Sequence, residues 1–220
     1  MDRLSEYFTD PRVAEVFAQY DARHKAELDA ARDLPAGSFG ARRDEFLLPV
    51  GAEVGRFLRA LAVGRRPERI LELGTSYGYS TLFLADAARQ CGARVVTVDR
   101  DAAKQAYARE RLEEAGLADV VEFRCGDALE IVNADEGEWG LVLLDIWKDL
   151  YVACFEAVYP RLAEEGVIGS DNMIYPEGAR AAVRALRQAI QAKGDLQTLL
   201  LPLGSGIELT VKWSAGNAKL

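Results

Sequence analysis

Short apolar runs alternate with helical stretches between residues 70 and 193, and this alternation restricts the fold more than any other feature of the sequence. The apolar runs are residues 70–73, 95–98, 120–123, 141–144 and 167–169. The helical stretches among and after them are residues 80–89, 102–115, 148–162 and 177–193. Continuous apolar strands separated by helices are typical of a parallel sheet covered on both faces. The sequence therefore predicts an α/β fold.

Two more strand-like runs lie near the C-terminus, at residues 199–203 and 207–213, with Gly204, Ser205 and Gly206 between them. This spacing predicts a hairpin with a bulged or longer turn. A hairpin that closes a parallel sheet makes the last strand antiparallel. This feature distinguishes the chain from a plain dinucleotide-binding fold.

Two helices are expected before the first strand. The first carries one apolar face, formed by Val13, Val16, Phe17, Tyr20 and His24. A loop rich in Gly and Pro is expected at residues 33–43. The second helix carries Val54, Phe57, Leu58 and Leu61 and is expected to end at Gly64.

Composition excludes several classes of function. The net charge is −8, and nucleic-acid binding needs a basic face, so no nucleic-acid partner is expected. No run of about 18 apolar residues occurs, so no membrane span is expected. The three cysteines, Cys91, Cys125 and Cys154, form no disulfide framework and no CxxC pair, which favours a reducing cytoplasm. His24 is the one histidine, so histidine triads and His-rich metal sites are excluded unless His24 itself acts.

A glycine-containing loop follows the first strand and reads LELGTSYGYS, residues 71–80. Glycine lets the backbone approach a ligand closely, and the following helix begins at the loop. The loop lacks the GxGxxG spacing and the Walker lysine, so a dinucleotide is not the expected ligand. A tight strand-to-helix turn without a ligand explains the loop about equally well.

Acidic residues follow the next two strands. Asp99 ends the second strand and can accept hydrogen bonds from both hydroxyls of a ribose. The alternative role, capping the next helix, fits Asp101 better. Asp127 follows the third strand, where it can reach an adenine amino group or cap a helix.

The strongest signal lies at the ends of the fourth and fifth strands. Asp145 follows one, and Asp171 and Asn172 follow the other. Adjacent ends of parallel strands converge on one crevice, so these oxygens can share a cation. Oxygen ligands without His or Cys favour Mg²⁺. Helix capping and turn formation are the alternative roles.

With these motifs the chain resembles the metal-dependent class I O-methyltransferases, and catechol O-methyltransferases in particular. The resemblance covers residues 46–213 and rests on ELGTSYGYS, LLDIWKDLY, SDNMIYPEGA and SGIELTVKW in this order. It implies a Rossmann-like fold with a seven-stranded, mostly parallel sheet, an antiparallel last strand and helices on both faces. It also implies a methyltransferase domain at 46–220, preceded at 1–45 by a helix and loop that serve as a cap or a dimer contact.

The resemblance assigns roles to individual residues. Asp145, Asp171 and Asn172 would bind Mg²⁺, Lys148 would be the general base, and Glu208 would hold the second substrate hydroxyl. The residues that would bind S-adenosylmethionine are Val50, Glu72, Gly74, Thr75, Ser76, Tyr77, Gly78, Ser80, Asp99, Arg100, Gly126, Asp127, Ala128, Asp145 and Trp147. Phe46, Leu48 and Val50 match the segment that lines the substrate and methionine pockets.

The implied activity is transfer of a methyl group to one hydroxyl of a catechol-like vicinal diol on a small aromatic molecule. Chelation by the metal would acidify a hydroxyl, and a lysine with a lowered pKa could take its proton. An ion pair with Asp149 is the plainer role for Lys148. Ile146, Ser205 and Phe46 replace a histidine, an aspartate and a tryptophan of the family, and the last of these leaves the acceptor open. A methyltransferase with a non-catechol acceptor and a non-catalytic S-adenosylmethionine-binding protein remain as alternatives, and a nicotinamide-dependent oxidoreductase ranks last.

Overall fold

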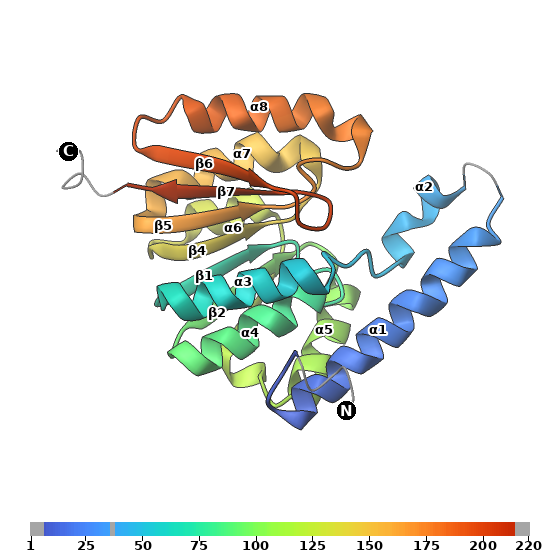
Figure 1. The fold of residues 1–220 in the computed structure, drawn as a ribbon. Helices are drawn as coiled ribbons and strands as arrows, with labels where there is room; N and C mark the ends of the chain where they lie inside the picture. The colour runs from blue at the N-terminus through green and yellow to red at the C-terminus, as the bar shows by residue number, and fades with distance from the viewer. Residues whose placement is uncertain (1–6, 36–37, 214–220) are drawn as a thin grey trace.

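A seven-stranded sheet forms the centre of the computed structural model, which describes residues 7–35 and 38–213 (Figure 1). The strand order is β3-β2-β1-β4-β5-β7-β6, and β7 is antiparallel to both of its neighbours. The predicted Rossmann-like sheet with an antiparallel last strand is therefore confirmed. The strands are β1(Arg69–Leu73), β2(Arg94–Asp99), β3(Val121–Cys125), β4(Trp139–Leu144), β5(Leu162–Ser170), β6(Leu196–Leu201) and β7(Ile207–Lys212).

Helices cover both faces of this sheet, as predicted. One face packs against α3, α4 and α5, with α1 on the outer side of α4 and α5, and the other face packs against α6, α7 and α8 (Figure 1). The helices are α1(Pro11–Arg32), α2(Phe39–Arg42), α3(Ala52–Arg65), α4(Tyr79–Cys91), α5(Ala102–Glu114), α6(Ala128–Ala134), α7(Tyr151–Val158) and α8(Arg180–Gln191).

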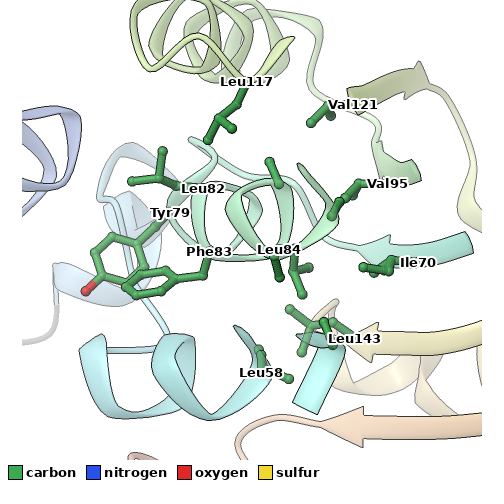
Figure 2. Close-up of a cluster of buried hydrophobic side chains, with 14 of the residues drawn as sticks. Leu58, Ile70, Tyr79, Leu82, Phe83, Leu84, Val95, Leu117, Val121 and Leu143 are labelled. Atoms are coloured by element: carbon green, nitrogen blue, oxygen red, sulfur yellow. The ribbon is translucent and has the colours of Figure 1, made fainter. Parts of the chain in front are cut away.

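The core explains why the strands are apolar at every position. In β4, Leu141 and Leu143 face α4, whereas Val142 and Leu144 face α6 and α7. Figure 2 shows the first of these two layers, where Leu58 of α3 lies near Leu143 of β4 and the ring of Phe83 lies beside that of Tyr79. Because side chains alternate along a strand, a sheet covered on both faces buries both sets.

The helix α1 shares this core. Its Val13, Val16 and Phe17 are buried, and the hydroxyl of Tyr20 donates to the carbonyl of Tyr77 at 2.6 Å. The second half of α1 and the short α2 stand away from the sheet (Figure 1). His24 lies on α1 and is half-buried, as its place on the apolar stripe predicts.

Several predicted bounds were wrong. The stretch at 33–43 is not all loop, because α2 and the 3-10 turn η2(Arg43–Glu45) form there; residues 36–37 lie outside the described residues. Helix α3 continues past Gly64, and Arg66 closes it in the left-handed conformation with φ 51°. The predicted strand at 199–203 begins earlier, at Leu196.

Other differences concern helices. No helix bounds were predicted between the third and fourth strands, although Asp127 was named as a possible helix cap; Asp127 caps the short α6 there. The helix expected at 148–162 is divided into η4(Lys148–Leu150), α7 and η5(Tyr159–Arg161). Pro160 lacks the backbone N–H that a continuing helix needs, which accounts for the break at η5.

Candidate active site

A cavity of about 410 Å³ opens at the carboxyl ends of the parallel strands. This is the edge of an open α/β sheet where ligands bind. The predicted cofactor-binding residues that line it are Gly74, Ser76, Asp99, Arg100, Gly126, Asp127, Ala128, Asp145 and Trp147. The predicted metal ligands Asp171 and Asn172 line it as well, together with the predicted base Lys148.

The glycine loop between β1 and α4 shapes one wall. Gly74 has φ 107°, and a Cβ there would overlap the carbonyl group of Asp145. Gly78 is left-handed with φ 87° and begins α4. Only glycine adopts these conformations at little cost, so the loop places backbone where side chains would otherwise stand.

Asp99 is oriented by backbone donors before any ligand binds. Its carboxylate accepts hydrogen bonds from the N–H of Ser76 at 2.7 Å and from the N–H of Asp101 at 2.9 Å. The capping role belongs to Asp101, which accepts from the N–H groups of Ala103 and Lys104 at the start of α5. Asp99 therefore lines the cavity in a fixed orientation, and the cap that the sequence left open lies two residues later.

A buried polar network supports the loop from below. Glu72 is fully buried and accepts hydrogen bonds from the hydroxyls of Ser80, Thr81 and Thr97 at 2.5–2.6 Å. Burial raises the pKa of Glu72 to about 7, although these hydrogen bonds oppose the rise. The hydroxyl of Thr97 also lies 2.6 Å from that of Thr75. Glu72, Thr75 and Ser80 thus hold the loop in place and do not line the cavity.

Three further predicted cofactor residues, Val50, Tyr77 and Gly78, also do not line the cavity. Val50 is buried in the core, and Gly78 begins α4. The ring of Tyr77 faces Arg23, whose guanidinium lies 3.8 Å from the ring centroid. The structure therefore does not bring these three into the cavity lining.

The two predicted acidic ligands continue the parallel ladder beyond the strands. The N–H of Asp145 donates to the carbonyl of Leu73 at 3.0 Å, and the N–H of Asp171 donates to the carbonyl of Leu144 at 3.1 Å. Adjacent strand ends thereby carry both carboxylates, and Asn172 follows with φ 55°. Lys148 lies beside them, with Nζ 3.9 Å from Oδ1 of Asp145.

The electrostatics of Asp145 and Asp171 suit a bound cation. Burial raises the pKa of Asp145, and burial together with the charge of Asp145 raises that of Asp171. Oδ1 of Asp171 is buried without a hydrogen-bond partner among the described residues. No three His, Cys, Asp or Glu side chains within residues 7–35 and 38–213 cluster as a metal-binding group. The third predicted ligand, Asn172, is an amide and would not count toward such a group. Two carboxylates and an amide, with Oδ1 of Asp171 lacking a hydrogen-bond partner among the described residues, fit a hard divalent ion.

Glu208 is not brought into the cavity. It is 3% exposed, and its carboxylate accepts from Nε of Arg187 at 2.8 Å and from the hydroxyl of Thr198 at 2.9 Å. On β7, Ile207 and Leu209 face α3 and α4, so Glu208 between them faces α8. The expectation that Glu208 contacts substrate does not match this placement, because its carboxylate is occupied under α8.

Comparisons with known proteins identify the family to which the chain belongs. A model described as a methyltransferase domain matches residues 71–173. A catechol O-methyltransferase of Mycobacterium tuberculosis is 37% identical over 155 residues, covering 67% of this chain and 70% of that protein. The chain belongs to the class I O-methyltransferases.

Further relatives of this O-methyltransferase extend the same picture. Caffeoyl-CoA O-methyltransferase 5 of Nicotiana tabacum is 27% identical over 184 residues, 74% of this chain and 76% of that one. Among solved structures, the O-methyltransferase of Bacillus cereus in complex with SAH has a TM-score of 0.71 at 25% identity and covers 95% of this chain and 99% of that chain.

The O-methyltransferase site also contains residues that sequence reasoning missed. The fully buried Tyr151 accepts a hydrogen bond from Nζ of Lys148, and its own hydroxyl donates to the carbonyl of Asp171 at 2.9 Å. Its position three residues after Lys148 could have indicated this contact, because residues three apart in a helix lie on the same face. It bridges the predicted base and a predicted metal ligand.

A segment between α1 and α3 closes the outer side of the cavity. The guanidinium of Arg43 lies 4.0 Å from the ring centroid of Trp147, and Asp44 pairs with Lys104 of α5 at 2.9 Å. The half-buried Phe46 of the sequence prediction packs against Phe39 at 5.2 Å between ring centroids. Phe39 and Leu48 line the cavity there, and Phe46 does not. The family resemblance predicted that Leu48 lies at a pocket, but it assigned no role to Phe39 or Arg43.

Proposed function

We propose that this enzyme transfers the methyl group of S-adenosylmethionine to one hydroxyl of a vicinal diol on a small aromatic ring, with the aid of a divalent ion, Mg²⁺. The main support for this proposal is that Asp145, Asp171 and Lys148 lie together at two adjacent strand ends. Relatives named for catechol and for caffeoyl-CoA support an acceptor ring with adjacent hydroxyls.

Asp145, Asp171 and Asn172 would hold the ion, since their oxygens are the hard ligands that Mg²⁺ prefers. The unpartnered Oδ1 of Asp171 supports this assignment. When bound, the ion supplies Lewis acidity that lowers the pKa of a coordinated hydroxyl.

Lys148 takes up the proton of the reacting hydroxyl. Burial lowers the pKa of its amine, with a smaller contribution from the charge of Arg43, while Asp145 and Asp171 oppose this shift. A lower pKa leaves more of the amine neutral at neutral pH, which a general base requires. Ile146 and Tyr151 hold Nζ beside the metal ligands, through a carbonyl at 3.3 Å and a hydroxyl.

The donor is held along the other half of the cavity. The proposed binding residues there are the loop residues Gly74 and Ser76, Asp99 at the end of β2, and Asp127. The carboxylate of Asp99 would accept from ribose hydroxyls, and the loop would leave room for the methionine part. Holding the donor and acceptor in line is the main requirement of methyl transfer.

A methyl-transfer assay over catechols with and without EDTA tests the proposal. We expect product with Mg²⁺, no product with EDTA, recovery on re-adding Mg²⁺, and a loss of at least about a hundredfold in Asp145→Asn. The matched control is Asp149→Asn, since Asp149 is exposed, lies four residues away and does not line the cavity. Full activity in EDTA and in Asp145→Asn would overturn the metal-dependent mechanism.

The acceptor class is the second part of the test. Methylation of amines or carboxylates with catechols untouched would replace the diol with another acceptor. Binding of S-adenosylmethionine without turnover on any diol would make the protein a non-catalytic binder.

Two further expectations from the sequence, a homodimer contact and a reducing compartment, remain proposals. We propose a homodimer contact on the projecting half of α1, where Leu28 is 48% exposed. Light scattering tests it by comparing the molar mass of the purified protein with that of Leu28→Glu.

The free thiols of Cys91, Cys125 and Cys154 support a reducing compartment such as the cytoplasm. No helix in the described residues is long and apolar enough to cross a membrane.

A further inference from the structure

An exposed arginine forms part of the outer wall of the cavity. Arg43 is exposed, lines the cavity, and rests its guanidinium 4.0 Å from the ring centroid of Trp147. A guanidinium stacked on an aromatic face keeps its N–H groups free at the edge of the plane. Arg43 therefore presents fixed hydrogen-bond donors at the mouth of the site.

The neighbouring charges are all paired. Arg42 pairs with Glu45 at 2.7 Å, and Asp44 pairs with Lys104 at 2.9 Å. In the part of the chain that the structure describes, no carboxylate lies within ion-pair distance of Arg43. Among residues 42–45, Arg43 is thus the one charged side chain without an ion-pair partner in the described residues, and it lines the cavity.

This charge faces the cavity that also holds the acceptor half of the site. Arg43 and the proposed base Lys148 line the same cavity. Trp147, on which Arg43 rests, is the residue directly before Lys148. A substituent of an acceptor held near Lys148 would thus lie in the field of Arg43.

We propose that Arg43 binds a carboxylate carried by the aromatic diol, so that the acceptors of this enzyme are acidic aromatic diols. The proposal rests on the proposed function, because it assumes a diol held at Asp145, Asp171 and Lys148. A guanidinium binds a carboxylate through two parallel hydrogen bonds, which gives both affinity and orientation.

The overall charge makes a local cation necessary for such an acceptor. The protein carries a net charge of −8, which repels anions at long range. A divalent ion would neutralise Asp145 and Asp171, and Arg43 would then leave the acceptor half positive. An acidic diol would gain from this arrangement, whereas a neutral diol would not.

A pair of near-isosteric acceptors tests the proposal: 3,4-dihydroxybenzoate, an anion, and 3,4-dihydroxybenzamide, which is neutral. We expect the wild-type enzyme to favour the benzoate by about tenfold in kcat/KM, and Arg43→Gln to bring this ratio close to one. Arg42→Gln is the matched control, because Arg42 pairs with Glu45 and does not line the cavity, so it should keep the ratio.

Each other outcome has a defined meaning. An equal rate on both acceptors in the wild type, or an unchanged ratio in Arg43→Gln, would overturn the proposal while leaving diol methylation intact. Weaker binding of S-adenosylmethionine in Arg43→Gln, measured by calorimetry, with the acceptor ratio unchanged, would assign Arg43 to the methionine carboxylate instead and would also overturn it. No turnover of either diol, with Mg²⁺ present, would contradict the proposed function itself.

Discussion

The carbonyl group of Asp145 lies directly against Gly74, on the side where any other residue would carry its Cβ. The N–H of Asp145 also donates to the carbonyl of Leu73 at 3.0 Å. The loop proposed to hold the methyl donor and the strand end proposed to hold the metal are therefore in contact. We expect a displacement of one wall of the cavity to displace the other, because the atoms in contact are close-packed.

Gly74→Ala tests this contact. The added methyl group would collide with Asp145, and φ 107° is strained for alanine, so we expect a loss of about 2 kcal/mol or more in unfolding free energy. Binding of S-adenosylmethionine should weaken at least about tenfold by calorimetry. Gly64→Ala is the control: Gly64 lies in α3 with open space around it, and alanine there should stabilise by about 0.5–1 kcal/mol. Unaltered donor binding in Gly74→Ala would contradict the close contact.

Tyr151→Phe should lower kcat by about tenfold or more with little change in donor KM, because the proposed base loses the hydroxyl that holds its Nζ. Steady-state kinetics measure this split. Tyr159→Phe removes a hydroxyl bonded to Asp195, remote from the cavity, and should keep kcat. In a Lys148→Met background, Tyr151→Phe should cost little more, since the two side chains act as a unit. Additive losses would mean that Tyr151 has only a structural role.

The pH dependence of stability should change in Glu72→Gln. The folded pKa of Glu72 is raised to about 7 from an ordinary value of 4.5, so folding favours its protonated form. This contribution is full below about pH 4.5 and is lost as the pH rises through 7. The melting temperature of Glu72→Gln relative to wild type should therefore rise between pH 5 and about 7.5 and then level off. A difference that stays constant across this range would show that Glu72 is ionised in the folded state.

Glu208→Gln separates the placement under α8 from the role that the family resemblance implied. Loss of the charge opposite Arg187 should reduce the unfolding free energy by about 2 kcal/mol, measured by thermal or urea unfolding. The KM for the diol should change less than about threefold, because Glu208 does not line the cavity. A large rise in diol KM without a loss of stability would restore the substrate-binding role.

Much of the site could be predicted from the sequence because it lies at strand ends. Strands are recognised from local apolar runs, and parallel strands bring their carboxyl ends to one edge whatever the details of packing. Asp99, Asp145 and Asp171 were accordingly predicted to face one crevice, and all three line the cavity. Family resemblance added Lys148, which lies beside Asp145.

Other features depend on contacts between distant parts of the chain. Arg43 meets Trp147 only because α1 and α3 place the segment between them across the site, and no local pattern carries that information. The short α6 is stabilised by its cap and its packing against α7, and its few residues show little periodicity.

The sequence by itself determined the α/β sheet, the glycine loop and the acidic strand ends, because periodicity and residue type act locally. Only the tertiary structure decided which of the carried-over residues face the cavity. Because β7 lies between β5 and β6, Glu208 faces Arg187. Glu72 and Ser80 are buried, and the hydrogen bond between them stabilises the loop. The face that a strand residue presents depends on the neighbours and helices around it, and these are set by long-range packing.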